Sequence, residues 1–206
     1  MHNARKRTAP ISDSGSSSSS VTSVTPKKKK KKVTKGKKRG GFLSSLEGWW
    51  LVDKAKSDSP QAYLKFMGLP DIAISAGVKA HEAHPTYISI LIKPGGRTVV
   101  TERHSRLLSG IVDKFKVNEV VTTTLKKLGG EKRIVVKAGE NGQLVTETTI
   151  PTQVGRVTVK DVRNILDDDT DVMHQVVTCE NIKNNEKLTR IVYYNRVPKP
   201  TLPLVF

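Results

Sequence analysis

The sequence predicts an all-β fold, an antiparallel barrel or sandwich with a single helical insertion. One strand at residues 48–54 comes first and begins with Gly48, Trp49 and Trp50. Two short helical segments follow it. The β-branched run at 86–92 then begins a succession of strands and turns that continues to residue 197. A helix pair placed this early in a β-rich chain is expected to cover the open end of a barrel.

Capping signals place the two helices. The polar stretch 57–59 followed by Pro60 is a good helix start, and Gly68 is a C-terminal signal. The second helix is expected to begin near Pro70 and Asp71, because an acidic residue in the first turn suits the helix dipole. Its expected apolar residues are Ile72, Ile74 and Val78.

Turn-forming residues divide the remainder into strands. Asn141-Gly142 is a strong hairpin signal between strands at 133–138 and 143–150. Further turns are expected at 93–96, 128–130, 167–171 and 184–186, and alternating apolar residues predict one strand passage over 111–121. The aspartate run at 167–171 lacks the glycine and distal glutamate of a calcium loop. His81, Glu82 and His84 match no zinc spacing, so no metal site is expected.

Polar residues on the predicted strands favour a barrel over a close-packed sandwich. A sandwich normally shows a cleaner apolar face. A barrel around a wet cavity tolerates inward polar residues, because water or ligand satisfies them. The residues that carry this argument are Thr122, Thr124, Thr146, Thr148, Lys160 and Arg163.

The positive charge of the chain is concentrated at its N-terminus. Residues 1–41 carry 13 Lys and Arg against one acidic residue, Asp13, in a chain of net charge +17. A serine-rich run at 14–20 and an unbroken lysine block at 27–32 bury too little apolar surface to offset the entropy of ordering. We therefore expect a disordered basic tail at 1–41, a folded domain at 42–197 and a proline-rich C-terminal extension at 198–206.

The basic tail has several candidate roles: a nuclear localisation signal read by an import receptor, a nucleic-acid patch, docking at an anionic membrane surface, or solubility alone. No aromatic residue is interleaved with the lysines, so phosphate attraction without base stacking is expected. The candidate nuclear-targeting or polyanion-binding residues are Lys27, Lys28, Lys29, Lys30, Lys31, Lys32, Lys35, Lys37, Lys38 and Arg39.

The single cysteine, Cys179, excludes an intramolecular disulfide and fits a reducing compartment. The N-terminus has no apolar segment typical of a secretory signal, and no run approaches the roughly 18–20 apolar residues of a membrane span. These features predict a cytoplasmic protein, and also a nuclear one if the tail acts as an import signal.

Four short motifs occur in a characteristic order. Trp49-Trp50-Leu51-Val52 resembles an opening Trp-x-Leu-Val strand, and residues 63–69 resemble a Tyr-Met-Lys-x-Leu-Gly-Val helix end. Residues 84–90 resemble a Lys-Pro-x-x-x-x-Ile passage, and 115–119 a Phe-x-x-Gly-x-Glu-Phe strand with its glycine replaced. In this order the chain from about 46 to 197 resembles the intracellular lipid-binding proteins, the fatty acid-binding and cellular retinoid-binding family of the calycin superfamily.

The resemblance implies a ten-stranded antiparallel up-and-down barrel, capped by the helix pair, that holds one or two lipids. In many members an inward Arg-x-Tyr on the last strand binds the ligand carboxylate, with help from an arginine two strands earlier. Here Arg190 is followed by Val192 where the tyrosine belongs; if Tyr194 is the motif tyrosine, Val192 replaces the arginine. Arg163 is the candidate for the earlier arginine, with Arg156 as the alternative.

These observations predict reversible, non-covalent binding and transport of a fatty acid or similar hydrophobic ligand, with Arg163, Arg190 and Tyr194 as ligand-binding residues. The alternative is a nucleic-acid- or chromatin-associated protein that uses the barrel as a scaffold. No nucleophile–base pair, phosphate loop or metal set indicates an enzyme. We expect no catalytic residue, no cofactor and a monomer.

Overall fold

The computed structural model describes residues 43–105 and 110–201, so the predicted tail and the last five residues lie outside the described part. The 3-10 turns are η1 (Ser44–Leu46), η2 (Lys126–Leu128) and η3 (Glu140–Gly142), and the helices are α1 (Gln61–Phe66) and α2 (Asp71–Ala83). The strands are β1 (Gly48–Asp53), β2 (Tyr87–Ile92), β3 (Thr98–His104), β4 (Ile111–Lys116), β5 (Val120–Leu125), β6 (Gly130–Ala138), β7 (Leu144–Thr152), β8 (Gly155–Leu166), β9 (Asp169–Asn181) and β10 (Lys187–Val197).

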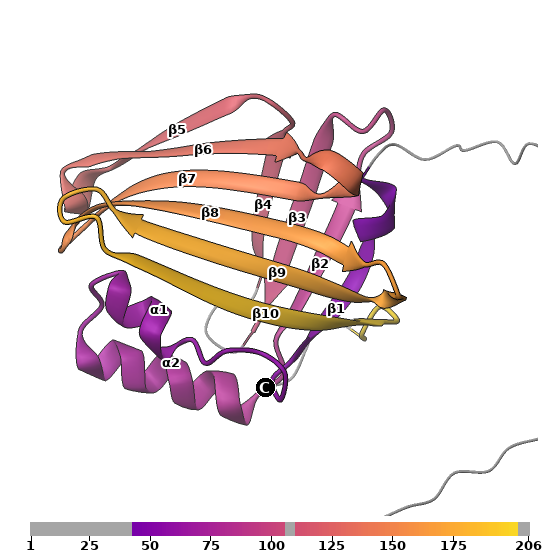
Figure 1. The fold of residues 1–206 in the computed structure, drawn as a ribbon, viewed down its shortest axis with the longest axis horizontal. Helices are drawn as coiled ribbons and strands as arrows, with labels where there is room; N and C mark the ends of the chain where they lie inside the picture. Colours follow the sequence, from indigo (N-terminus) through magenta and orange to yellow (C-terminus); the bar gives the residue numbers. More distant parts are fainter. Residues whose placement is uncertain (1–42, 106–109, 202–206) are drawn as a thin grey trace, which may run out of the picture. The chain divides into compact units, whose positions relative to one another are not determined.

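The strands form one ten-stranded sheet in the order β4-β3-β2-β1-β10-β9-β8-β7-β6-β5. Neighbours in this order pair antiparallel, and β10 pairs with β1, so the sheet curves round into a nearly closed barrel whose two edges are β4 and β5. Figure 1 shows β5 to β10 as the near wall and β1 to β4 behind it. The predicted ten-stranded barrel with a helix pair is therefore confirmed, and the sandwich is excluded.

Alternation along the strands directs apolar side chains inward. Along β9 the buried positions are Met173, Gln175, Val177, Cys179 and Asn181, two residues apart as the pleat requires. One core cluster surrounds Trp50, whose side chain is fully buried. In a second cluster, Tyr63, Phe66 and Met67 of the first helical segment pack on buried strand residues that include Val177 and Cys179. The helix pair thus covers one end of the barrel, as expected.

Of the apolar residues named for α2, Ile74 is buried and Ile72 is 82% exposed. One sequence-based expectation is wrong in detail. The single strand passage expected over 111–121 is two strands. Asn118 has φ 65° and its N–H donates to the Val136 carbonyl at 2.7 Å, so the chain turns there. Asparagine tolerates this left-handed conformation.

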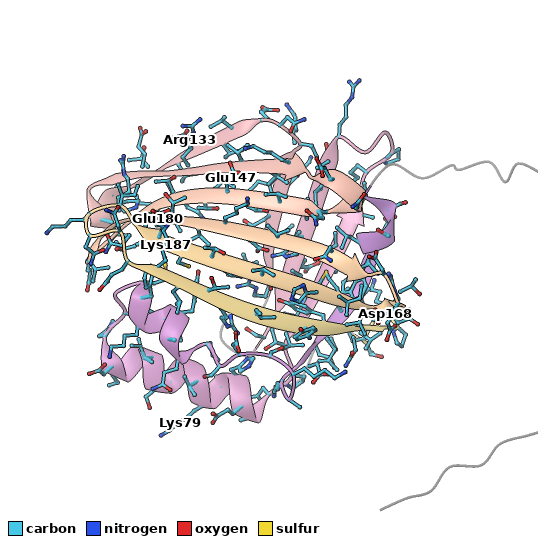
Figure 2. All side chains as sticks on the ribbon, in the orientation of Figure 1. Lys79, Arg133, Glu147, Asp168, Glu180 and Lys187 are labelled. Atoms are coloured by element: carbon cyan, nitrogen blue, oxygen red, sulfur yellow. The ribbon has the colours of Figure 1, made fainter. Side chains whose placement is uncertain are left out.

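The polar strand residues divide between the two faces. Thr146, Thr148 and Arg163 line the barrel interior. Thr122, Thr124 and Lys160 are exposed on the outer face. Side chains alternate along a strand, and the residues next to Lys160 in the sequence face inward. Thr122 and Thr124 face outward for the same reason, because residues next to their register partners on β6 face inward. Figure 2 shows Arg133, the register partner of Thr122, pointing away from the barrel.

Candidate ligand-binding cavity

The barrel interior holds two adjoining cavities. Cavity 1, of about 250 Å³, is lined mainly by β2 to β4 and β6 to β8. Cavity 2, of about 270 Å³, lies under the helices and is lined by α1, α2 and the inner faces of β8, β9 and β10. Tyr63, Arg103, Val159 and Asp161 line both cavities. The two spaces therefore adjoin along a shared wall.

A buried ion pair stands where cavity 1 meets the core. Arg163 and Asp161 are two residues apart on β8, so the pleat directs both inward. Arg163 Nη2 lies 2.8 Å from Asp161 Oδ2, and the Arg163 side chain is 9% exposed. Burial is the largest single influence and lowers the pKa of Arg163, but Asp161, Tyr194 and Asp113 together raise it by more, so the net shift is upward. The guanidinium therefore stays charged, with a partner from its own strand.

Two further residues extend this pair into a network, called here the β8–β10 polar cluster: Asp161, Arg163, Gln175 and Tyr194. Gln175 Nε2 donates to Asp161 Oδ2 at 2.7 Å, and the Tyr194 hydroxyl donates to Gln175 Oε1 at 2.5 Å. Burial raises the pKa of Tyr194, so the phenol stays protonated near neutral pH. Within the described part of the chain, Arg163 Nε and Asp161 Oδ1 are buried without a hydrogen-bond partner.

Arg190 lies at the helix end of β10 and lines cavity 2. Its Nε and Nη2 both donate to the Asp58 carbonyl, each at 3.3 Å, which is long for such bonds. The Asp58 carboxylate instead accepts the Ile191 N–H at 2.7 Å. Burial lowers the pKa of Arg190, and neighbouring Tyr194 and Tyr63 oppose that shift only in part. The Arg190 guanidinium therefore has further N–H groups that the Asp58 carbonyl does not use.

The three predicted ligand-binding residues all lie inside the barrel, but they form two groups. Arg190, Val192 and Tyr194 share the inner face of β10, so no Arg-x-Tyr pair is formed in either register. Tyr194 belongs with Arg163 in the β8–β10 polar cluster, whereas Arg190 lies under the helices. The alternative Arg156 is exposed, and the next residue, Val157, is the buried one. Of the two arginines considered, the structure brings Arg163 to the cavity.

Sequence reasoning missed Arg103 and His81, both of which line cavity 2. Arg103 follows Val99 and Thr101 at two-residue spacing on β3, a signal that was available once the strand was assigned. His81 lies on the barrel side of α2, whereas Lys79 points away from the barrel in Figure 2. Burial lowers the pKa of His81, and the charges of Arg190 and Lys54 lower it further.

Among the described residues no group of three or more His, Cys, Asp or Glu is placed to hold a metal ion. None of the described helices is long and apolar enough to cross a membrane. Burial raises the pKa of the Cys179 thiol to about 11. The ten basic residues proposed for targeting or polyanion binding, Lys27 to Arg39, lie outside the described residues.

Solved structures share this fold. Lipid binding protein 8 of Caenorhabditis elegans, in its apo form, matches with a TM-score of 0.57 at 13% identity, over 75% of this chain and 97% of that one. Secretory abundant heat soluble protein 4 of Ramazzottius varieornatus matches with 0.54 at 16%, over 74% and 95%. Zebrafish ileal bile acid-binding protein, complexed with cholic acid, matches with 0.51 at 15%, over 75% and 100%.

The chain therefore has the ten-stranded barrel fold of the lipid-binding proteins. The resemblance to the fatty acid-binding and cellular retinoid-binding family is confirmed at the level of the fold, which is what likenesses at these identities show. No family model matches the sequence, and no curated protein matches it.

Proposed function

We propose that this protein binds a small hydrophobic or amphiphilic molecule, of the fatty acid type, reversibly and without covalent chemistry. The observation that carries the proposal is the pair of adjoining cavities inside the barrel. Each falls just below the lower bound of about 300 Å³ for typical ligand pockets, so a lipid of ordinary size needs both. Two structures with the same fold are of a lipid binding protein and of a bile acid-binding protein complexed with cholic acid.

Arg163, Arg190 and Tyr194 are the proposed polar contacts for the ligand. All three line a cavity wall that otherwise includes apolar residues such as Val159 and Val192. A mixed wall of this kind suits an amphiphile, whose chain gains from apolar burial while its polar end accepts hydrogen bonds. The proposal makes the protein a carrier rather than an enzyme, with no cofactor, acting as a monomer.

Binding is testable with a cavity-filling variant and its matched control. The delipidated full chain should bind a long-chain fatty acid at one or two sites, as measured by isothermal titration calorimetry. Thr148→Phe places a large ring inside cavity 1 and should weaken binding at least tenfold. Thr122→Phe makes the same change on the outer face of β5 and should leave affinity unchanged. Absence of binding to the unaltered chain, or equal effects of the two variants, contradicts the proposal.

For the basic tail we propose docking of the loaded carrier at anionic membrane surfaces or, through an import receptor, entry from the cytoplasm into the nucleus. The proposed organisation is a tail at 1–41, the barrel at 42–197 and an extension at 198–206. The alternative, a nucleic-acid-associated protein with the barrel as scaffold, is favoured only by the charge of the tail. Mass spectrometry of co-purifying lipids, and of nucleic acid retained at physiological salt, separates the two.

A further inference from the structure

Cavity 2 carries an excess of positive charge. Its described walls contain two guanidiniums, Arg103 and Arg190, and the imidazole of His81. The single carboxylate among them, Asp161, already accepts hydrogen bonds from Arg163 and Gln175 at one of its oxygens. That carboxylate therefore neutralises Arg163 and leaves the cations of cavity 2 without a matching anion. The two guanidiniums come from β3 and β10 and the imidazole from α2, and all three converge on one space.

The cations of cavity 2 are also short of hydrogen-bond acceptors. Among the described residues Arg190 reaches only the Asp58 carbonyl, through two bonds of 3.3 Å. Arg103 forms no ion pair with any residue of the described chain. The two guanidiniums are close enough that the charge of Arg103 adds to the effect of burial in lowering the pKa of Arg190. Like charges facing one partly buried space are stabilised when an anion lies between them.

The β8–β10 polar cluster differs in this respect. Arg163 there has its own carboxylate at 2.8 Å, and Gln175 and Tyr194 complete a chain of hydrogen bonds around it. An incoming anion would have to displace Asp161 or lie beside it, and both arrangements are unfavourable. The cluster instead presents a nearly neutral polar surface, with Arg163 lining cavity 1, Gln175 and Tyr194 lining cavity 2, and Asp161 lining both.

From this contrast we infer that cavity 2 is an anion subsite, in which Arg103 and Arg190, with His81 beside them, hold the acidic head group of an amphiphile under the helix pair. The ligand is an organic anion with an apolar chain, such as a carboxylate or sulfonate. Its chain extends past Tyr63 and Val159, which line both cavities, into cavity 1. The inference rests on the proposed function and adds the charge and orientation of the ligand.

A matched pair of ligands tests the anion subsite separately from the proposed ligand-binding function. Decanoate and 1-decanol share a chain length and differ in the charge of the head group. Calorimetry at pH 7.5 on the full chain should show that Arg103→Gln and Arg190→Gln each weaken decanoate by about tenfold to a hundredfold. Affinity for 1-decanol should stay within about twofold, which also shows that each variant is folded. Arg156→Gln, on the outer face, should change neither affinity.

A second variant tests the competing position for the head group. Arg163→Met combined with Asp161→Asn removes the deep ion pair without changing the net charge. The ratio of decanoate to decanol affinity in this double variant should equal that of the unaltered chain. Loss of the ratio here, with retention in Arg103→Gln and Arg190→Gln, overturns the inference and places the head group on Arg163. Equal losses for both ligands in the two single variants also overturn it. If neither ligand binds the unaltered chain, the proposed function itself fails.

Discussion

At the scale of single residues, the energetics of the barrel interior depend on Asp161. A buried guanidinium without a partner is strongly destabilising, and removing one member of a buried pair costs about 3–5 kcal/mol. Asp161 lies 2.8 Å from Arg163 and also accepts a hydrogen bond from Gln175. The Asp161 carboxylate therefore contributes first to the stability of the fold. It affects ligand binding indirectly, because it neutralises the charge of Arg163.

Asp161→Asn should lower the free energy of unfolding by about 3 kcal/mol, because it leaves the Arg163 charge buried and unpaired. Urea denaturation at neutral pH measures this loss. Adding Arg163→Met should recover most of it, since replacing both partners removes the unpaired charge. Glu147→Gln is a matched control: Glu147 pairs with Lys137 at 2.6 Å, but both side chains are more than a third exposed. Its loss should stay below about 1 kcal/mol. Similar losses for the two single variants would falsify the burial argument.

The individual cavity residues were only partly predictable from the sequence. Arg163, Arg190 and Tyr194 were all found through the family resemblance. Asp161 and Arg103 share two-residue spacing with cavity residues, yet the sequence does not say which face of a strand is inner when polar residues occupy both. Lys160 and Arg163 looked equivalent for this reason. Register between strands, which is a long-range property, separates them.

At the scale of the elements, Arg196 of β10 closes the barrel end at η1. Its guanidinium carbon lies 4.1 Å from the centroid of the Trp50 ring. Its Nη1 donates to the Glu47 carbonyl at 2.7 Å and its Nη2 to the Ser45 carbonyl at 2.8 Å. One side chain thus holds η1 against β1 and β10. Gly48 allows this approach, because it has φ 137° and a Cβ there would lie 2.8 Å from Arg196 Nη1.

Arg196→Ala should lower the free energy of unfolding by about 2 kcal/mol, since it removes a cation–π contact and charge-assisted hydrogen bonds from a side chain that is only partly exposed. Arg196→Lys keeps the charge but not the planar fork, so about half of that loss is expected. Arg156→Ala on the outer face of β8 serves as the control and should stay within about 0.5 kcal/mol. If all three variants show the same free energy of unfolding in urea, Arg196 does not stabilise this end of the barrel.

The order of the elements was predictable because it depends on local signals. Pro60 and Pro70 mark the two helix starts within a residue, and Asn141-Gly142 forms the turn between β6 and β7 with both residues at positive φ. The boundary between β4 and β5 was missed. Asn118 was the local signal for that turn, but the apolar alternation on both sides concealed it. Closure of the sheet by β10 on β1 was reached only through the family resemblance.

At the scale of the whole molecule, charge is divided unevenly along the chain. Residues 1–41 hold 13 of the 36 basic residues and one of the 19 acidic residues. Each basic residue near an anionic surface contributes about 1 kcal/mol, and the effect is screened over a Debye length of about 10 Å at 0.1 M salt. This magnitude supports the proposal that the lysine block at 27–32 docks a loaded barrel at an anionic membrane.

The lysine block should accelerate delivery of a bound lipid. The full chain, loaded with a fluorescent fatty acid, should transfer it to vesicles that contain phosphatidylserine faster than a variant with residues 27–32 changed from lysine to serine. A variant with the same six positions changed to arginine is the control and should keep the fast rate, because charge is retained. The advantage should disappear near 0.5 M salt, where the Debye length falls to about 4–5 Å. Equal transfer by the serine and lysine chains at low salt contradicts membrane docking. If no lipid loads while the full chain binds duplex DNA at physiological salt, the tail serves nucleic acid and the barrel is its scaffold.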